Sequence, residues 1–196
     1  MEEDIKIVSL IYADAIVTLQ DPGAQRLSAL FSGKERTEAF KEYLLLKFFL
    51  MMFFTTSKDE SKEKEEIVHL LTQSTLFTTI DLLQHYDYIK CSIEEITKRC
   101  SEYMDSMDAF DGSWVAREFI RGLHVKLPKE FLNEEELGNI VRDAFKFMIP
   151  IIRNPSTSPM YQGFIKSCIQ GNKQRTGCLS SMLVLTSLLA VALSVL

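Results

Sequence analysis

The stretch Cys178–Leu196, CLSSMLVLTSLLAVALSVL, decides how the rest of this sequence is interpreted. Its nineteen residues include seven leucines and three valines, and no charged residue, proline or glycine. As an α-helix rising about 1.5 Å per residue it would be roughly 28 Å long, close to the hydrocarbon thickness of a bilayer. We therefore predict one C-terminal transmembrane helix, a tail anchor over residues 178–196. The alternative is a buried core helix of a water-soluble fold.

The tail has two further features with open interpretations. The residues that we assign to the membrane anchor are Cys178, Leu179, Leu183, Leu185, Leu188, Leu189, Leu193 and Leu196. Cys178 lies at the membrane boundary, where it is either an acylated cysteine or an ordinary free thiol. Small residues form a stripe along one side of the tail: Ser180, Ser187, Ala190 and Ser194. Such a stripe is compatible with self-association of two membrane helices, or with serines scattered in a moderately apolar anchor.

Charge is divided unevenly along the chain. The formal net charge of all 196 residues is −5. Five basic residues and no acidic residue follow Asp143, so residues 1–143 carry −10. An acidic body argues against nucleic acid as a partner, because phosphate binding needs a basic surface.

The basic residues nearest the tail predict the orientation of the chain in the membrane. They are Lys166, Lys173 and Arg175, in a juxtamembrane linker over residues 156–177 that we expect to contain a short helix. Cytoplasmic flanks of membrane helices are enriched in such residues, and anionic lipids attract them. The N-terminal segment MEEDIKIVSL lacks the positive region of a secretory signal. We therefore expect a single-pass membrane protein whose acidic helical domain, residues 1–155, faces the cytosol.

Helical spacing dominates this body, and sparse glycines and prolines separate the periodic segments. The spacing predicts an all-α fold, a single globular bundle of six or seven helices followed by the transmembrane helix. Two segments have the spacing of a capping box, Ser57–Glu60 and Ser92–Glu95. The expected helices are 5–19, 24–31, 35–56, 58–90, 92–107, 114–123 and 137–151. The β-branched residues Thr75, Thr78 and Thr79 would bend or break the fourth.

The segment Leu44–Phe54 is apolar except for Lys47, and is too short to span a bilayer. We expect it to form the central core helix. Lys47 is interpreted as a lysine whose stem lies along the surface while its ammonium reaches water. The alternative is a buried ammonium paired with an acid, because a buried lysine without a partner would lose its proton.

A few polar residues are candidates for catalysis. Glu66 and His69 have the Glu-x-x-His spacing that places a carboxylate and an imidazole on one helix face, but the second copy that a di-iron bundle needs is absent. Asp81 and His85 are four residues apart and could orient one another. The sequence contains no phosphate-binding loop and no metal-ligand motif, so we predict no cofactor and no metal.

These observations favour a membrane-anchored helical adaptor that presents a cytosolic partner-binding domain at a membrane surface, in a groove beside the helix at 35–56. The expected partners are the lipid bilayer and a protein of unknown identity. One alternative is a helical enzyme in which the glutamate, histidine and aspartate side chains converge on a pocket. Another is a body that inserts into membranes through Leu44–Phe54 and alters their permeability.

Overall fold

The computed structural model describes residues 2–56, 62–84, 89–106, 114–123 and 134–163. In this part of the chain the secondary structure is entirely helical, as predicted, with seven α-helices and no strand. The helices are α1 (Glu2–Val17), α2 (Pro22–Leu30), α3 (Gly33–Thr56), α4 (Lys62–Gln84), α5 (Ile93–Asp105), α6 (Trp114–Gly122) and α7 (Glu134–Arg153). A 3₁₀ turn, η3 (Pro155–Thr157), follows α7, and residues 159–163 are again helical.

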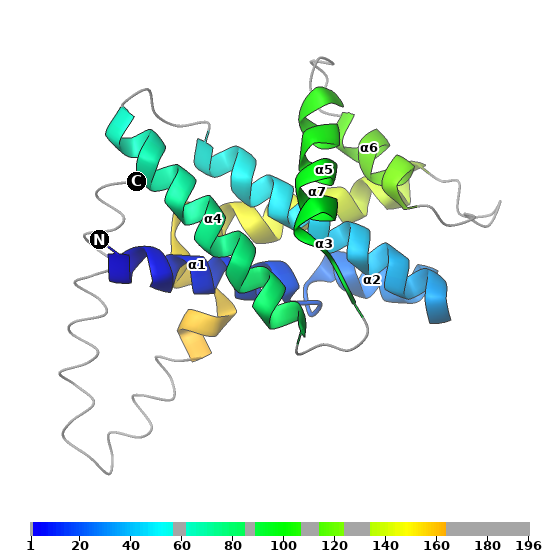
Figure 1. Ribbon diagram of the computed structural model, residues 1–196. Coiled ribbons are helices and arrows are strands. Elements are labelled where there is room, and N and C mark those ends of the chain that lie inside the picture. The colour runs from blue at the N-terminus through cyan, green and yellow to red at the C-terminus, as the bar shows by residue number, and fades with distance from the viewer. Residues whose placement is uncertain (1, 57–61, 85–88, 107–113, 124–133, 164–196) are drawn as a thin grey trace, which may run out of the picture.

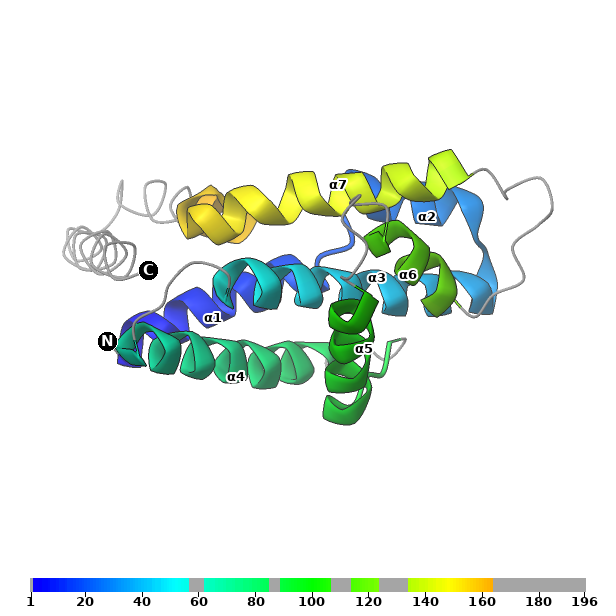
Figure 2. The same cartoon turned by 90° about the horizontal axis from the view of Figure 1, so that it is seen from above.

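Helix α3 is the centre of the bundle, and it contacts each of the other six α-helices. Figure 2 shows it running through the middle, with α7 on one side and α4 on the other. Its residues 42–51 are all buried, and burying each leucine or phenylalanine side chain contributes about 1.5–3 kcal/mol. The prediction that Leu44–Phe54 forms the core helix is confirmed for its first two turns, while residues 52–54 are partly buried.

Local capping fixes where several helices begin. Asp21 is the N-cap of α2, where its carboxylate accepts a hydrogen bond from the backbone N–H of Ala24 at 3.1 Å, and Pro22 occupies the first helical turn. At α5 the predicted capping box is present. The Ser92 hydroxyl accepts from the Glu95 N–H at 3.1 Å, and the Glu95 carboxylate accepts from the Ser92 N–H at 2.9 Å. The other predicted capping box, Ser57–Glu60, lies outside the described residues.

Helix α4 is continuous through its threonines, so a break there, one of the two expected outcomes, is wrong. The hydroxyls of Thr75, Thr78 and Thr79 donate to the carbonyls of Leu71, Ser74 and Thr75 at 2.8, 2.8 and 2.7 Å. Each threonine therefore satisfies its hydroxyl within its own helix without interrupting the backbone.

The first and last helices of the body lie against each other. The buried Tyr12 hydroxyl of α1 donates to the backbone carbonyl of Ile152, near the end of α7, at 3.0 Å. Burial raises the pKa of Tyr12 above its ordinary value, so the phenol remains a donor. Figure 1 also shows the C-terminal part of the described chain next to the first helix, with residues 159–163 lying near α1.

None of the described helices combines the length and the apolar character that a membrane span requires. The predicted transmembrane helix over 178–196 lies outside the described residues, as do Lys166, Lys173, Arg175 and the small-residue stripe.

Candidate functional site

The catalytic candidates named from the sequence lie along one helix. Glu66, His69 and Asp81 are all exposed on α4. Glu66 and Asp81 are fifteen residues apart, which on a helix corresponds to roughly 22 Å. His85 lies outside the described residues. Within the part of the chain that the structure describes, these side chains do not surround a common pocket, and no group of histidine, cysteine and carboxylate side chains could hold a metal ion.

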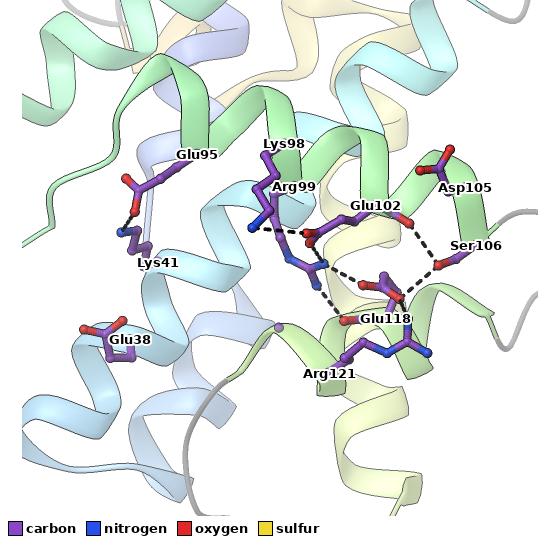
Figure 3. Close-up of a pocket in the computed structure, with 11 residues that line it drawn as sticks. Glu38, Lys41, Glu95, Lys98, Arg99, Glu102, Asp105, Ser106, Glu118 and Arg121 are labelled. Carbon is purple, nitrogen blue, oxygen red and sulfur yellow. Dashed lines mark hydrogen bonds and ion pairs between the residues drawn. The ribbon is translucent and has the colours of Figure 1, made fainter.

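A pocket with a volume of about 670 Å³ opens instead between α3, α5 and α6. We call it the charged pocket, because nine of its eleven lining residues carry a charge. The lining residues are Glu38, Lys41, Glu95, Lys98, Arg99, Glu102, Asp105, Ser106, Glu118, Arg121 and Gly122. Figure 3 shows that α5 supplies most of them along the upper side, while α3 and α6 form the rest of the wall.

Arg99 is in the pocket wall because α5 turns its buried face towards α3. The buried residues of α5 are Ile96, Arg99, Cys100 and Tyr103, at the i, i+3, i+4 and i+7 positions of one helix face. Figure 1 shows α5 standing across α3, so this face meets the core helix near Glu42. This packing places a guanidinium among apolar side chains. A buried guanidinium is tolerated only if each of its N–H donors has a hydrogen-bond acceptor.

The partners of Arg99 come from all three helices of the pocket. From α3, the Glu42 carboxylate accepts from Nε at 2.9 Å and from Nη2 at 2.7 Å. From α6, Glu118 accepts from Nη1 at 2.6 Å with its carboxylate, and from Nη2 at 2.6 Å with its backbone carbonyl. From α5 itself, Glu102 accepts from Nη1 at 2.6 Å. All five N–H donors of the guanidinium are used.

The two buried carboxylates are held by further donors. Tyr103 donates its hydroxyl to Glu42 at 2.8 Å, and its ring lies 4.6 Å from the Arg99 guanidinium carbon. Ser106 and Arg121 donate to the second oxygen of Glu118 at 2.9 and 2.8 Å. We call Arg99, Glu42, Glu118 and Tyr103 the arginine network. It fastens α5 and α6 to α3 through charge-assisted hydrogen bonds.

Electrostatics keep this network ionised. Burial alone would lower the pKa of Arg99, but the hydrogen bonds to Glu42 and Glu118 outweigh it and raise that pKa. Burial likewise would raise the pKa of Glu118, and the hydrogen bonds from Arg99 and Ser106 instead hold that pKa below its ordinary value. A permanently charged guanidinium with every donor occupied is suited to fixing the shape and charge of the pocket wall, and not to proton transfer.

The cations around the pocket are paired within the protein. Lys41 contacts Glu95 at 2.7 Å, and Lys98 lies 3.8 Å from Glu102. Glu38 and Asp105 are exposed at two ends of the pocket, where Figure 3 draws no interaction between them and the other lining residues. The pocket therefore presents charged side chains of both signs, and none of its lining residues has a hydrophobic side chain.

A second buried cation lies deeper in the bundle, at the junction of α1, α2 and α3. Lys47 Nζ donates to the carbonyls of Ala15 and Thr18 at 3.0 and 2.5 Å, and to the Asp21 carboxylate at 3.0 Å. Its side chain is fully buried, as is that of Asp21. The preferred interpretation of Lys47 as a surface lysine is therefore wrong, and the alternative, a buried ammonium paired with an acid, is confirmed. Three acceptors match its three N–H donors, which removes the need for water.

The Lys47 site is closed on its remaining sides by aromatic rings. Tyr43 donates its hydroxyl to the other Asp21 oxygen at 2.5 Å, and the rings of Tyr43 and Phe147 lie 5.0 and 5.1 Å from Nζ. Burial lowers the pKa of Lys47 to about 8, against the attraction of Asp21. We call Lys47, Asp21 and Tyr43 the lysine cluster.

A usable signal for both sites is present in the sequence, although helix patterning alone does not use it. Arg99, Glu42 and Lys47 are charged residues at positions that helical spacing assigns to the core, and a buried charge requires a buried partner. What the sequence could not supply is the identity of the partner, since Glu42 and Arg99 are separated by 57 residues. Comparisons with protein-family models, curated proteins and solved structures give no match for this chain.

Proposed function

We propose that this chain is a membrane-anchored interaction protein whose charged pocket contacts a partner protein. The observation that carries the proposal is the pocket itself: nine charged side chains from three helices, with its inner wall fixed by a fully hydrogen-bonded arginine. Such a surface presents a defined pattern of charge, and electrostatic complementarity governs the specificity and the association rate of protein partners.

The position of the pocket in the bundle supports this assignment. Figure 2 shows residues 159–163 and α6 towards opposite ends of the bundle. A membrane anchor at residues 178–196 would be joined to the end of the bundle at residues 159–163. The charged pocket would then be directed away from the lipid and accessible to a partner. Confinement to a surface raises the effective concentration of two partners, so a modest affinity is sufficient.

The two other functions have less support from the described residues. Catalysis by Glu66, His69 and Asp81 requires them to converge, and they lie along about 22 Å of one helix. Membrane insertion by Leu44–Phe54 requires α3 to leave its contacts with all six other helices. Either function therefore needs a large rearrangement of the bundle.

The anchor is tested by membrane fractionation with carbonate extraction. We expect the full-length chain to remain in the membrane pellet and a chain shortened to end at Arg175 to be found in the supernatant. Extraction of the full-length chain by carbonate would contradict the anchor, whatever the pocket binds.

The pocket is tested in the full-length chain in cells by replacing Lys98 with a photo-crosslinking amino acid. Lys98 is well suited because its side chain is 79% exposed at the pocket. The matched position is Arg142, which is exposed on α7 and does not line the pocket. We expect a discrete crosslinked adduct from position 98 and none from position 142. Equal labelling from both positions, or none from either, would contradict a partner at the pocket.

A further inference from the structure

Helix α4 has an unusual composition for the outermost helix of a bundle. From Ile67 to Leu83 it contains one aspartate, Asp81, and no glutamate, lysine or arginine. Apolar residues occur on every side of this segment. A helix that is apolar all round is normally covered all round. Figure 2 nevertheless shows α4 at the edge of the bundle, where it packs chiefly against α1.

Helix α4 buries some polar side chains and exposes some apolar ones, the reverse of the usual pattern. Two threonines, Thr75 and Thr79, are turned inwards and are 0% and 2% exposed. Two large apolar side chains are turned outwards, with Phe77 55% and Leu70 43% exposed. Phe77 and Leu70 are seven residues apart, so they share one helix face, which we call the outer face of α4. Of the large hydrophobic residues described, Phe77 is the most exposed.

We propose that the outer face of α4 binds the chain's own residues 178–196 when no bilayer is available to them. Those nineteen residues carry no charge, so in water they need an apolar surface to cover them. Between the exposed acids Glu66 and Asp81, the outer face of α4 carries no aspartate, glutamate, lysine or arginine, and Leu70 and Phe77 are its exposed apolar side chains. This inference shares the apolar tail with the proposed function but does not require that the tail is inserted stably in a membrane.

The lengths and the path of the chain allow this contact. Tyr161 is buried against the bundle, and Figures 1 and 2 show residues 159–163 in the half of the bundle that contains α1 and α4. The fourteen residues 164–177 can span up to about 46–50 Å when extended. Helix α4 is about 34 Å long, and nineteen helical residues are about 28 Å long. The tail can therefore reach α4 and lie along most of it.

Binding of the tail to α4 would compete with its transfer to lipid. The chain would exist in two states, one with the tail on α4 and one with the tail in the bilayer, and lipid would shift the population towards the second. In the second state the outer face of α4 becomes uncovered.

The test uses the full-length chain, translated without membranes, with Phe77 replaced by benzoylphenylalanine. We expect irradiation to produce an intramolecular crosslink to residues 178–196, mapped by mass spectrometry. Phosphatidylcholine–phosphatidylserine liposomes should reduce its yield at least fivefold. The same probe at Arg142 should give no such crosslink. A crosslink between two copies, no crosslink to the tail, or an equal yield from position 142 would each overturn the proposal.

A substitution gives an independent readout. Phe77→Lys places a charge on the outer face and should increase the initial rate of liposome binding several-fold, because it releases the tail. Ser28→Lys adds the same charge to an exposed position on α2 and should leave the rate unchanged. Equal rates for the two variants would count against the proposal, provided that circular dichroism shows both to be folded. Carbonate extraction separates this inference from the anchor, since a crosslinked but extractable tail would uphold docking and refute stable insertion.

Discussion

The arginine network and the lysine cluster are two solutions to the same problem, a cation inside a helical bundle. Lys47 is 0% exposed, and two of its three acceptors are backbone carbonyls. Arg99 has a 9% exposed side chain at the pocket wall, and carboxylates take most of its donors. Lys47 joins the connection between α1 and α2 to the core helix α3, whereas Arg99 joins the three helices α3, α5 and α6.

The difference shows how side-chain chemistry sets what each site can do. A buried ammonium can release its proton, and burial lowers the pKa of Lys47 to about 8. A guanidinium does not release its proton in a protein, and its carboxylate partners raise the pKa of Arg99 further. A surface that must keep one charge pattern is therefore better built around arginine, while a closed core site tolerates lysine.

The largest expected effect is that of Arg99→Met, because it removes the cation that the buried carboxylates of Glu42 and Glu118 share and leaves Glu118 with only the exposed Arg121 as a cationic partner. We expect a loss of about 5 kcal/mol in the free energy of unfolding, at the upper end for a broken buried ion pair. Urea unfolding followed by Trp114 fluorescence measures it. The neighbouring Lys98→Met removes an exposed ion pair and should change stability by less than about 1 kcal/mol. Similar losses for the two variants would mean that the network contributes little.

Lys47→Met should have the next largest effect, about 3 kcal/mol, since Lys47 pairs with one buried carboxylate whereas Arg99 pairs with two. Asp21 would still accept from Tyr43 and from the Ala24 N–H. Adding Asp21→Asn to this variant removes the stranded charge and keeps a good N-cap residue, so part of the stability should return. A loss for Lys47→Met larger than that for Arg99→Met would reverse the comparison.

Gly122→Ala tests how closely the arginine network is packed. A Cβ at this position would overlap Arg99 Nη2 and the Glu42 carboxylate carbon, so the network must shift. We expect a loss of about 2 kcal/mol, typical of overpacking. Gly138 in α7 is the matched control, because a Cβ there meets nothing within 4 Å. Gly138→Ala should be neutral or stabilising by up to about 1 kcal/mol.

The smallest expected effect, taken over one pH unit, is a dependence of stability on pH that belongs to the lysine cluster alone. Between about pH 8 and 10.5 the unfolded chain retains a proton at Lys47 that the folded chain has released, so stability from this group rises with pH. The difference in free energy of unfolding between the wild type and Lys47→Met should increase by about 1 kcal/mol per pH unit there. Taking the difference cancels the opposite effect of the buried thiols, such as Cys100, whose pKa burial raises to about 12. A difference that stays constant to pH 10 would refute the lowered pKa of Lys47.

Local chemistry in the sequence was sufficient for the helices. Ser92 and Glu95 identify the start of α5 because both partners of a capping box lie within one turn. The predicted break at the threonines of α4 was wrong. β-Branched residues disfavour helices on average, but here the threonine hydroxyls donate hydrogen bonds to backbone carbonyls one turn earlier in the same helix. Propensity is a weak prior that such contacts override.

Long-range pairing could not be predicted in the same way. Nothing near Arg99 in the sequence indicates that Glu42 completes its site, and the charged pocket exists only once α3, α5 and α6 meet. Lys47 was misjudged for the same reason, because its partner Asp21 lies 26 residues earlier, beyond a turn. The interpretation of residues 178–196 as a tail anchor remains a prediction.

The contact between Tyr12 and Ile152 joins positions 140 residues apart, and it has a consequence for how the chain folds. Helix α1 is synthesised well before its neighbours α4 and α7. Its apolar residues, Val8 and Ile11 among them, remain uncovered in the nascent chain until then. Because folding slows as contacting residues become more distant in sequence, this protein should fold more slowly than bundles in which consecutive helices pair. During that interval it should depend on chaperones for protection against aggregation.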